Sequence, residues 1–335
     1  MLRIAALSLM ILIQAGFTAW GAGAIYFSHP AHPLQGGILA GLFAALGLVT
    51  MAGVMLVRYR RRALAGFVCL GVVVMAWWSG ITPSNDRQWK AEVAVAPYAT
   101  IDGDRVTLHN IRNFDYRSET DFTPGYYDNT FDLRELVGVD VIASYWAGPH
   151  IAHVFLSFDF GEGDHLAISI ERRDEVGEGY STVKGLFRQF ELFYVVADER
   201  DVIRLRTNYR ADPPEDVYVY RVAGPIKNGR RLFLEYIHEI NSLRDQPEFY
   251  NTMLTNCTSN IWMHSRVNPG HLRYSWKLLL SGHVPEYLYE QGRLDPSLPF
   301  PELRERSRIN ERARGAGVDA DFSRRIREDL PGIPN

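Results

Sequence analysis

The stretch HIAHVFLSFDFGEGDHLAISIERR, residues 150–173, decides the fold of most of this chain. Side chains alternate with a period of two on either side of GEGD (161–164), whose glycines favour a tight turn. The pattern predicts a β-hairpin with strands that begin at His153 and His165. Pairing through this turn places Glu171 opposite His153, whereas His165 lies at the other end of the first strand.

The segments around the hairpin add strands first and helices afterwards. Helical spacing over 228–246 predicts a helix with one apolar face, and 274–292 is also predicted to be helical. The order of elements predicts an α+β fold for the domain at 81–295. Residues 296–335 are charged and poor in apolar side chains, which predicts a charged C-terminal tail, either a solvated helix or a loose segment. Further strands are expected at 139–146, 190–199, 201–209 and 216–222, and a hairpin turn at 102–104.

The first 80 residues form a separate membrane domain in this interpretation. They contain no Asp, Glu or Lys, and three apolar runs at 4–27, 37–57 and 63–79. Each run is close to the roughly 17–25 residues that cross a hydrocarbon core. The first run also has features of a cleaved signal peptide, with Arg3 before it, but the two spans that follow make cleavage unnecessary.

Arginines predict how these spans are oriented. RYRRR (58–62) lies between the second and third runs, and positive loops stay on the cytoplasmic side. Arg3 then also faces the cytoplasm, and residues 81–335 lie outside it. All 39 acidic residues fall in that outer region, against 36 basic residues in the whole chain. An acidic region without a basic patch does not suit nucleic acid, so no nucleic-acid partner is expected.

LTNCTSNIW (254–262) holds the only cysteine of the outer region, because Cys69 lies in the third span. Asn256 is a good N-cap residue, so Cys257 is expected to open a helix. The helix dipole and free backbone N–H groups lower the pKa of such a thiol. The same turn, with Asn256 and Thr258, is a candidate helix cap or oxyanion site. The alternative is a buried and inert cysteine.

A nucleophilic thiol needs a base, and the hairpin offers one. Eight of the ten histidines lie in the outer region, but only three of them frame the hairpin: His150, His153 and His165. His153 is the candidate general base. Glu171, by hairpin geometry, or His165 is the candidate third group that orients the imidazole, and the choice stays open. Ser157 and Asp159 share the strand face of His153 and are weaker candidates.

Four segments carry a resemblance to a known family: AHVFLSF (152–158), LAISIERRDEVGEGYS (166–181), GLFRQFELFYVVADERDVIRLRTNYR (185–210) and FYNTMLTNCTSNI (249–261). Over roughly residues 105–270 the chain resembles the Lnb N-terminal periplasmic domain family of bacterial membrane proteins. That family has a characteristic histidine and an Asn-Cys-Thr motif. The resemblance maps them onto His153 and onto Asn256, Cys257 and Thr258. It implies a multi-pass protein of the bacterial inner membrane, with a cytoplasmic N-terminus and a periplasmic main domain.

A more distant similarity is to circularly permuted papain-like thiol enzymes, including the lecithin retinol acyltransferase type. In these enzymes a histidine on an early strand precedes a cysteine that opens a later helix. The order of His153 and Cys257 fits this pattern. A second polar residue follows on the next strand in the acyltransferase type; His165 fits it by order and Glu171 by geometry. The inserted RRDEVGEGY (172–180) and the additional strands depart from the pattern.

These observations predict a Cys-His hydrolase or acyltransferase that acts on an amide or ester of a cell-envelope peptide, lipoprotein or lipid, without cofactor or metal. One alternative is a non-catalytic binding, assembly or chaperone module on the same fold, because fold does not fix function. A second alternative is a metal-dependent hydrolase with ligands from His150, His153, His165 and Asp164 or Glu171. Its weakness is that residues three apart on a strand point to opposite faces.

Overall fold

The structure, a computed structural model, describes residues 2–28, 33–179 and 181–333. It begins with three long helices, α1 (Leu2–Phe27), α2 (Pro33–Met55) and α3 (Arg60–Ser79). Each of them is long and apolar enough to cross a membrane. The three predicted spans are therefore confirmed as apolar helices.

The chain divides into two compact units. The first holds the helices α1–α3, the chain as far as Ser84, and residues 181–190 of the later sequence. Within this unit Phe187 stacks on Phe27, with 5.1 Å between the ring centroids. Gly23 makes this approach possible, because a Cβ atom there would lie 2.6 Å from the Phe187 ring. A short piece of the predicted periplasmic region therefore packs with the membrane helices.

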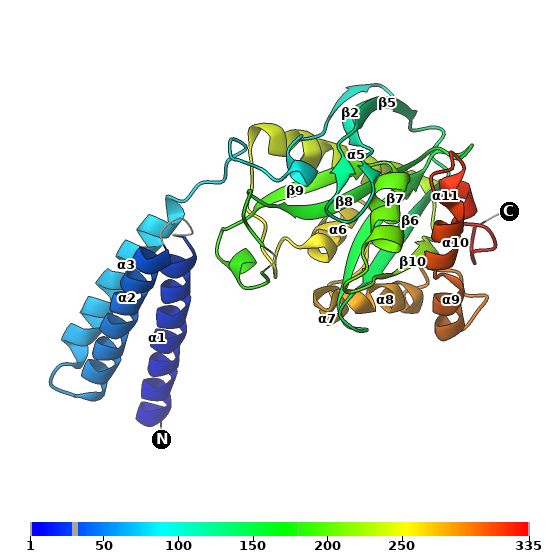
Figure 1. The fold of residues 1–335 in the computed structure, drawn as a ribbon. Coiled ribbons are helices and arrows are strands. Elements are labelled where there is room, and N and C mark those ends of the chain that lie inside the picture. Colours follow the sequence, from blue (N-terminus) through cyan, green and yellow to red (C-terminus); the bar gives the residue numbers. More distant parts are fainter. Residues whose placement is uncertain (1, 29–32, 180, 334–335) are drawn as a thin grey trace. The chain divides into compact units, whose positions relative to one another are not determined.

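The second unit is built on one large sheet (Figure 1). Its strands run in the order β1-β2-β9-β8-β7-β6-β10, and β5 pairs with β2 on the edge opposite β1. All neighbours are antiparallel except β2 and β9. The strands are β1 (Tyr98–Asp102), β2 (Arg105–Arg112), β5 (Tyr126–Asp132), β6 (Gly138–Tyr145), β7 (Ala152–Asp159), β8 (His165–Arg173), β9 (Glu191–Ala197) and β10 (Asp216–Arg221), with a small separate pair β3 (Asp115–Tyr116) and β4 (Phe122–Thr123).

The hairpin that the sequence predicts is present as β7 and β8. Gly161 and Gly163 in the turn have φ angles of +80° and +86°, which glycine adopts without steric cost. The register pairs Asp159 with His165 and Leu156 with Ile168. The α+β fold is confirmed.

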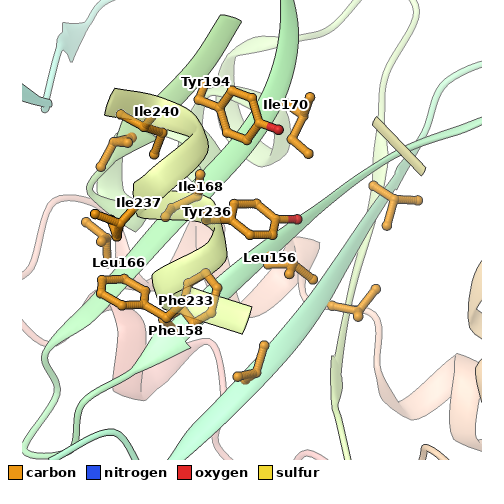
Figure 2. Close-up of a cluster of buried hydrophobic side chains, with 14 of the residues drawn as sticks. Leu156, Phe158, Leu166, Ile168, Ile170, Tyr194, Phe233, Tyr236, Ile237 and Ile240 are labelled. Carbon is orange, nitrogen blue, oxygen red and sulfur yellow. The ribbon is translucent and has the colours of Figure 1, made fainter. Parts of the chain in front are cut away.

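Both faces of the sheet are covered by helices. On one face, apolar side chains of β7, β8 and β9 pack against α5 (Ile226–Asp245) (Figure 2). This helix matches the predicted 228–246, because its apolar residues recur at helical spacing. Shorter helices follow it in the same layer: α6 (Cys257–Ser265), α7 (Trp276–Leu279) and α8 (Val284–Glu290). The predicted helix at 274–292 is thus broken, and a 3-10 turn, Ser281–His283, separates its two parts.

The C-terminal residues are folded onto the opposite face of the sheet. They form α9 (Phe300–Arg306), α10 (Asn310–Ala316) and α11 (Phe322–Arg325), of which α10 and α11 cover that face (Figure 1). Ile309, Phe322 and Ile326 are completely buried there. A solvated tail at 296–335 was therefore the wrong expectation. Leu303 of α9 packs in the core that contains α5, whereas Ile309, Phe322 and Ile326 pack in the core of the opposite face.

Residues 201–209 are helical and not a strand as predicted. Asp198 accepts a hydrogen bond from the backbone N–H of Arg200 and caps α4 (Glu199–Arg204). A π-helical turn, η3 (Leu205–Tyr209), continues it. The apolar and charged residues of this stretch satisfy strand alternation and helical spacing about equally, and the cap decides between them. The remaining short turns are η1 (Ala91–Val93) and η2 (Lys184–Leu186).

Candidate active site

The strands β7 and β8 separate at one end of the hairpin. Their backbone pairing runs from Asp159 and His165 as far as Leu156 and Ile168, whereas β7 stays paired with β6 back to Ala152. His153 therefore lies where β7 has left β8. Its side chain is 14% exposed, and its ring stacks on that of Phe155.

Three side chains meet at this opening. The Nε2 atom of His153 lies 2.6 Å from the hydroxyl of Ser169 and 3.0 Å from a carboxylate oxygen of Glu171. The Ser169 hydroxyl also contacts that oxygen, at 2.8 Å. Continuing the hairpin register places Glu171 opposite His153, as expected from the sequence. Because Nε2 is engaged on this side, Nδ1 is the ring nitrogen left for another partner.

The thiol of Cys257 lies close enough to the imidazole of His153 for each of the two groups to shift the pKa of the other. Burial raises the pKa of the thiol, but the hydrogen bond to His153 and the charge of the imidazolium outweigh burial and lower it. The backbone N–H of Val154 also contributes to lowering the pKa of the thiol. The separation of β7 from β8 explains why an N–H group of a central strand can point at a side chain.

The pKa of the His153 imidazole is shifted in the opposite direction, upward. Burial alone would lower the pKa of His153. The carboxylate of Glu171 and the hydrogen bonds to Cys257 and Glu171 outweigh burial and raise this pKa to about 9. Lowering one pKa and raising the other favours the thiolate–imidazolium pair at neutral pH, and the thiolate is the reactive form of cysteine.

The helix α6 presents the thiol as its first residue. Asn256 is the N-cap: its side-chain oxygen accepts the backbone N–H of Ser259 at 2.9 Å, and its amide donates to the carbonyl of Thr252 at 2.8 Å. Thr258 is 2% exposed and donates to the carbonyl of Leu278 at 2.6 Å. The side chains of Asn256 and Thr258 are thus used to build the helix end. The backbone N–H groups of Cys257 and Thr258, which begin the helix, remain available to an oxyanion.

Arg206 completes the cluster and was not expected from the sequence. It lies in η3 with 5% of its side chain exposed, and donates to Glu171 at 3.1 Å. Burial raises the pKa of Glu171, but the charges of His153 and Arg206 and their hydrogen bonds hold it well below its usual value. Because 201–209 was interpreted as a strand, nothing in the sequence placed Arg206 near Glu171. The Asp198 cap was the one signal for a helix there.

His165 is not brought to this cluster. It lies next to the turn, at the opposite end of the hairpin from His153, and its Nε2 atom is 3.5 Å from Asp159. The two-residue periodicity correctly predicts that His165 lies on the second strand. The strand register, however, pairs His165 with Asp159 at the turn, far along the hairpin from His153. Asp159 and Ser157, the weaker candidates, contact Arg221 and Glu199 respectively.

The structure also separates the histidines of the metal hypothesis. His150 contacts His283 at 2.8 Å, while His153 and His165 keep the different partners given above. Across residues 2–28, 33–179 and 181–333, no three His, Cys, Asp or Glu side chains form a group suited to a metal ion. The proposed donor set is therefore not assembled.

An apolar cavity of about 210 Å³ lies beside the site. Two of the residues that line it are direct neighbours of the site in sequence: Val154, the residue after His153, and Thr258, the residue after Cys257. Its walls come from both β-strands and helices, and include Val141, Leu156, Leu232, Ile261, Trp262 and Leu278. A cavity of this chemistry suits an apolar group next to the reacting atoms.

Replacing Glu171 with glutamine tests the electrostatics of this site. The imidazolium of His153 would lose its carboxylate, so its pKa should fall from about 9 toward the ordinary value of about 6.5. The alkaline limb of the pH–rate profile for acylation by an ester should therefore move toward neutral pH by up to about two units. Asp128→Asn is the matched control, because Asp128 contacts His109 at 2.7 Å elsewhere on the sheet. A profile that Glu171→Gln leaves unchanged would count against the assignment.

Comparison with known proteins supports the predicted family. Residues 122–282 match the family model described as the Lnb N-terminal periplasmic domain. This range begins later and ends later than the predicted 105–270, and it includes His153, Glu171 and Cys257. No curated protein and no solved structure matches the chain, and the distant papain-like similarity stays a prediction. Residues 122–282 belong to the Lnb N-terminal periplasmic domain family, and the chain is a membrane protein with a periplasmic domain.

Proposed function

We propose that this protein is a thiol enzyme of the cell envelope, a hydrolase or acyltransferase that acts on an amide or ester. The observation that carries the proposal is the chain of contacts from Cys257 to His153 to Glu171. The thiol interacts with the imidazole strongly enough to have its pKa lowered, and the imidazole lies 3.0 Å from a carboxylate oxygen of Glu171. A nucleophile, a base and a group that orients the base are the minimum for nucleophilic catalysis.

The proposed reaction begins with attack of the Cys257 thiolate on the carbonyl carbon. A carbon–sulfur bond forms, and the carbonyl electrons move to oxygen. When the carbonyl re-forms, the bond to the alcohol or amine breaks, and the imidazolium of His153 gives that leaving group its proton. Water or an acceptor amine or alcohol, deprotonated by His153, then attacks the thioester and releases Cys257.

The surroundings of the thiol favour a substrate with an apolar acyl group. The cavity beside Cys257 is lined mainly by aliphatic and aromatic side chains, and burying each CH₂ group of an acyl chain contributes about 0.8 kcal/mol. Among envelope peptides, lipoproteins and lipids, this lining is most compatible with an acyl-bearing lipid or lipoprotein. Peptide bonds flanked by small polar residues would leave the cavity without an occupant.

We also infer the orientation in the membrane. Of the four arginines of 58–62, Arg58 lies between α2 and α3 and the other three begin α3, and positively charged residues at the end of a span remain cytoplasmic. Three spans then put the N-terminus in the cytoplasm and the domain that carries Cys257 in the periplasm. Fusing a reporter active only in the periplasm after residue 57 and after residue 84 tests this: only the second fusion should be active.

The direct test of the function uses the full chain purified in detergent with p-nitrophenyl butyrate. An acylating thiol should release one equivalent of p-nitrophenolate per protein in a fast phase, before slower turnover. Release that follows only the uncatalysed hydrolysis of the ester would favour the alternative of a non-catalytic binding module. The same assay serves for the variants discussed below.

A further inference from the structure

One buried hydroxyl close to the site has no hydrogen-bond partner. Tyr236 lies in the middle of α5 and is completely buried. Its hydroxyl makes no hydrogen bond to any described residue. Buried polar groups almost always have a hydrogen-bond partner, because an unpaired group loses its hydrogen bonds to water on folding without forming new ones. A buried hydroxyl without a hydrogen-bond partner therefore points to a partner that is absent from the free protein.

The ring of Tyr236 is fixed by aromatic neighbours. Its centroid lies 4.7 Å from that of His264, 5.8 Å from that of Tyr194 and 5.9 Å from that of Phe158. Figure 2 shows the ring extending away from α5, with the hydroxyl at its far end. The three neighbouring rings fix the orientation of the Tyr236 ring, so packing sets the direction of the hydroxyl.

Tyr236 lies against the helix that starts at the thiol. His264, its closest ring neighbour, is seven residues after Cys257 and so shares a face of α6 with it. Leu232, one turn before Tyr236 on α5, lines the apolar cavity together with Thr258. Burial and, after it, the charge on Cys257 raise the pKa of Tyr236 well above its usual value. The hydroxyl therefore stays protonated and is able to donate a hydrogen bond.

The neighbouring Tyr194 provides a contrast. Its hydroxyl is bonded to the Nε2 atom of His264 at 2.5 Å. Burial lowers the pKa of His264 to about 4, so the imidazole is neutral and can accept this bond. Tyr194 and Tyr236 are neighbours in this core, and the hydroxyl of Tyr194 has its hydrogen-bond partner within the protein. Tyr236 is left with a donor and no acceptor.

We propose that the hydroxyl of Tyr236 donates a hydrogen bond to the oxyanion that forms when Cys257 attacks a carbonyl. The missing acceptor would be the substrate oxygen. When the thiolate adds to the carbonyl carbon, the displaced electron pair rests on this oxygen, and the Tyr236 O–H and the N–H groups that begin α6 hold it. The bond needs no proton transfer, and it is released when the carbonyl re-forms and the leaving group departs. This inference rests on the proposed function.

Tyr236→Phe tests the proposal with two reagents that both consume the thiol. p-Nitrophenyl butyrate acylates it through an oxyanion, whereas iodoacetamide alkylates it by direct displacement without one. In the full chain in detergent, the variant should be acylated about 10²–10³-fold more slowly, the usual cost of one oxyanion donor. Its alkylation rate should equal that of the wild type. Its melting temperature should not fall, because the hydroxyl that is removed has no partner in the free protein.

Tyr194→Phe is the matched control. It removes a hydroxyl that is bonded to His264, so its melting temperature should fall while its acylation rate stays within about twofold of the wild type. Equal acylation rates in Tyr236→Phe and wild type would overturn the inference and leave the proposed function intact. An equal loss of acylation and alkylation would overturn it in favour of a structural role. A wild-type protein that is alkylated but never acylated would overturn the proposed function itself, and this inference with it.

Discussion

Cys257→Ser is expected to abolish acylation by p-nitrophenyl butyrate, with a loss on the order of 10⁴–10⁶-fold. Serine keeps the shape of the helix start and its N-cap, but the ordinary pKa of its hydroxyl is far above that of a thiol. The surroundings lower the pKa of a thiol at this position through the interactions with His153 and with the backbone N–H of Val154. Neither interaction is sufficient to ionise an alcohol. The measurement is the amplitude of the fast phase of p-nitrophenolate release.

His153→Ala should cause a loss of similar size, because the thiolate would lose the cation that stabilises it. The double variant should be no worse than either single variant, since groups that act as one unit do not contribute additively. Cys69→Ser is the control, because Cys69 lies in α3 and is exposed. Retention of a full fast phase in Cys257→Ser would mean that another group carries the acyl chain. Its loss in Cys69→Ser would contradict the assignment to Cys257.

The second large effect concerns stability. Arg327→Met should lower the free energy of unfolding by about 3–5 kcal/mol, because it removes one partner of a buried ion cluster. Arg327 is 4% exposed at its side chain and lies 2.8 Å from Asp140 and 2.5 Å from Glu199, both completely buried. Burial raises the pKa of Glu199, yet the charge of Arg327 is the main reason why this pKa lies at about 2. Urea denaturation of the full chain in detergent measures the loss.

The loss should depend on pH in a definite direction. In the wild type the depressed pKa of Glu199 gives stability that is present above about pH 4.5 and is lost as the pH falls toward 2. Without Arg327 the buried carboxylate should prefer a proton, so the variant should be least affected near pH 4 and most affected at neutral pH. Arg324→Met is the control: Arg324 is 60% exposed in its pairs with Asp321 and Glu328. The free energy of unfolding of Arg324→Met is expected to stay within about 0.5 kcal/mol of the wild type. Equal losses in Arg324→Met and Arg327→Met would contradict the role of the buried ion cluster.

Much of the fold could be predicted because local sequence decides it. Alternation on either side of GEGD specifies β7 and β8 and their register. That register alone brings Glu171 to His153. Asn256 marks the start of α6 for a local reason too, since its side chain caps the helix that it precedes. The contact between Cys257 and His153, in contrast, could be stated only as an expectation, because no local rule fixes how α6 meets β7.

The missed features depend on contacts between distant parts of the chain. Arg327 looks like any charged residue of a tail, yet its buried partners are 187 and 128 residues away in sequence. Arg206 was placed on a strand because its segment fits both periodicities, and only the Asp198 cap and the packing of α4 resolve the choice. Tyr236 lies on the apolar face that the spacing of 228–246 predicts, and nothing in that spacing distinguishes it from its apolar neighbours. Its unpaired hydroxyl is visible only once every neighbour is in place.

The proposed reaction passes through a covalent thioester at Cys257, so the most direct measurement is the mass of the acylated protein. The full chain in detergent is mixed with p-nitrophenyl butyrate, quenched in acid during the fast phase, digested and mapped by mass spectrometry. The account predicts a butyryl group on the peptide that contains Cys257, a lower occupancy in Tyr236→Phe at the same time point, and none in His153→Ala. A wild-type peptide that stays unmodified at Cys257, or an acyl group found elsewhere, would contradict it.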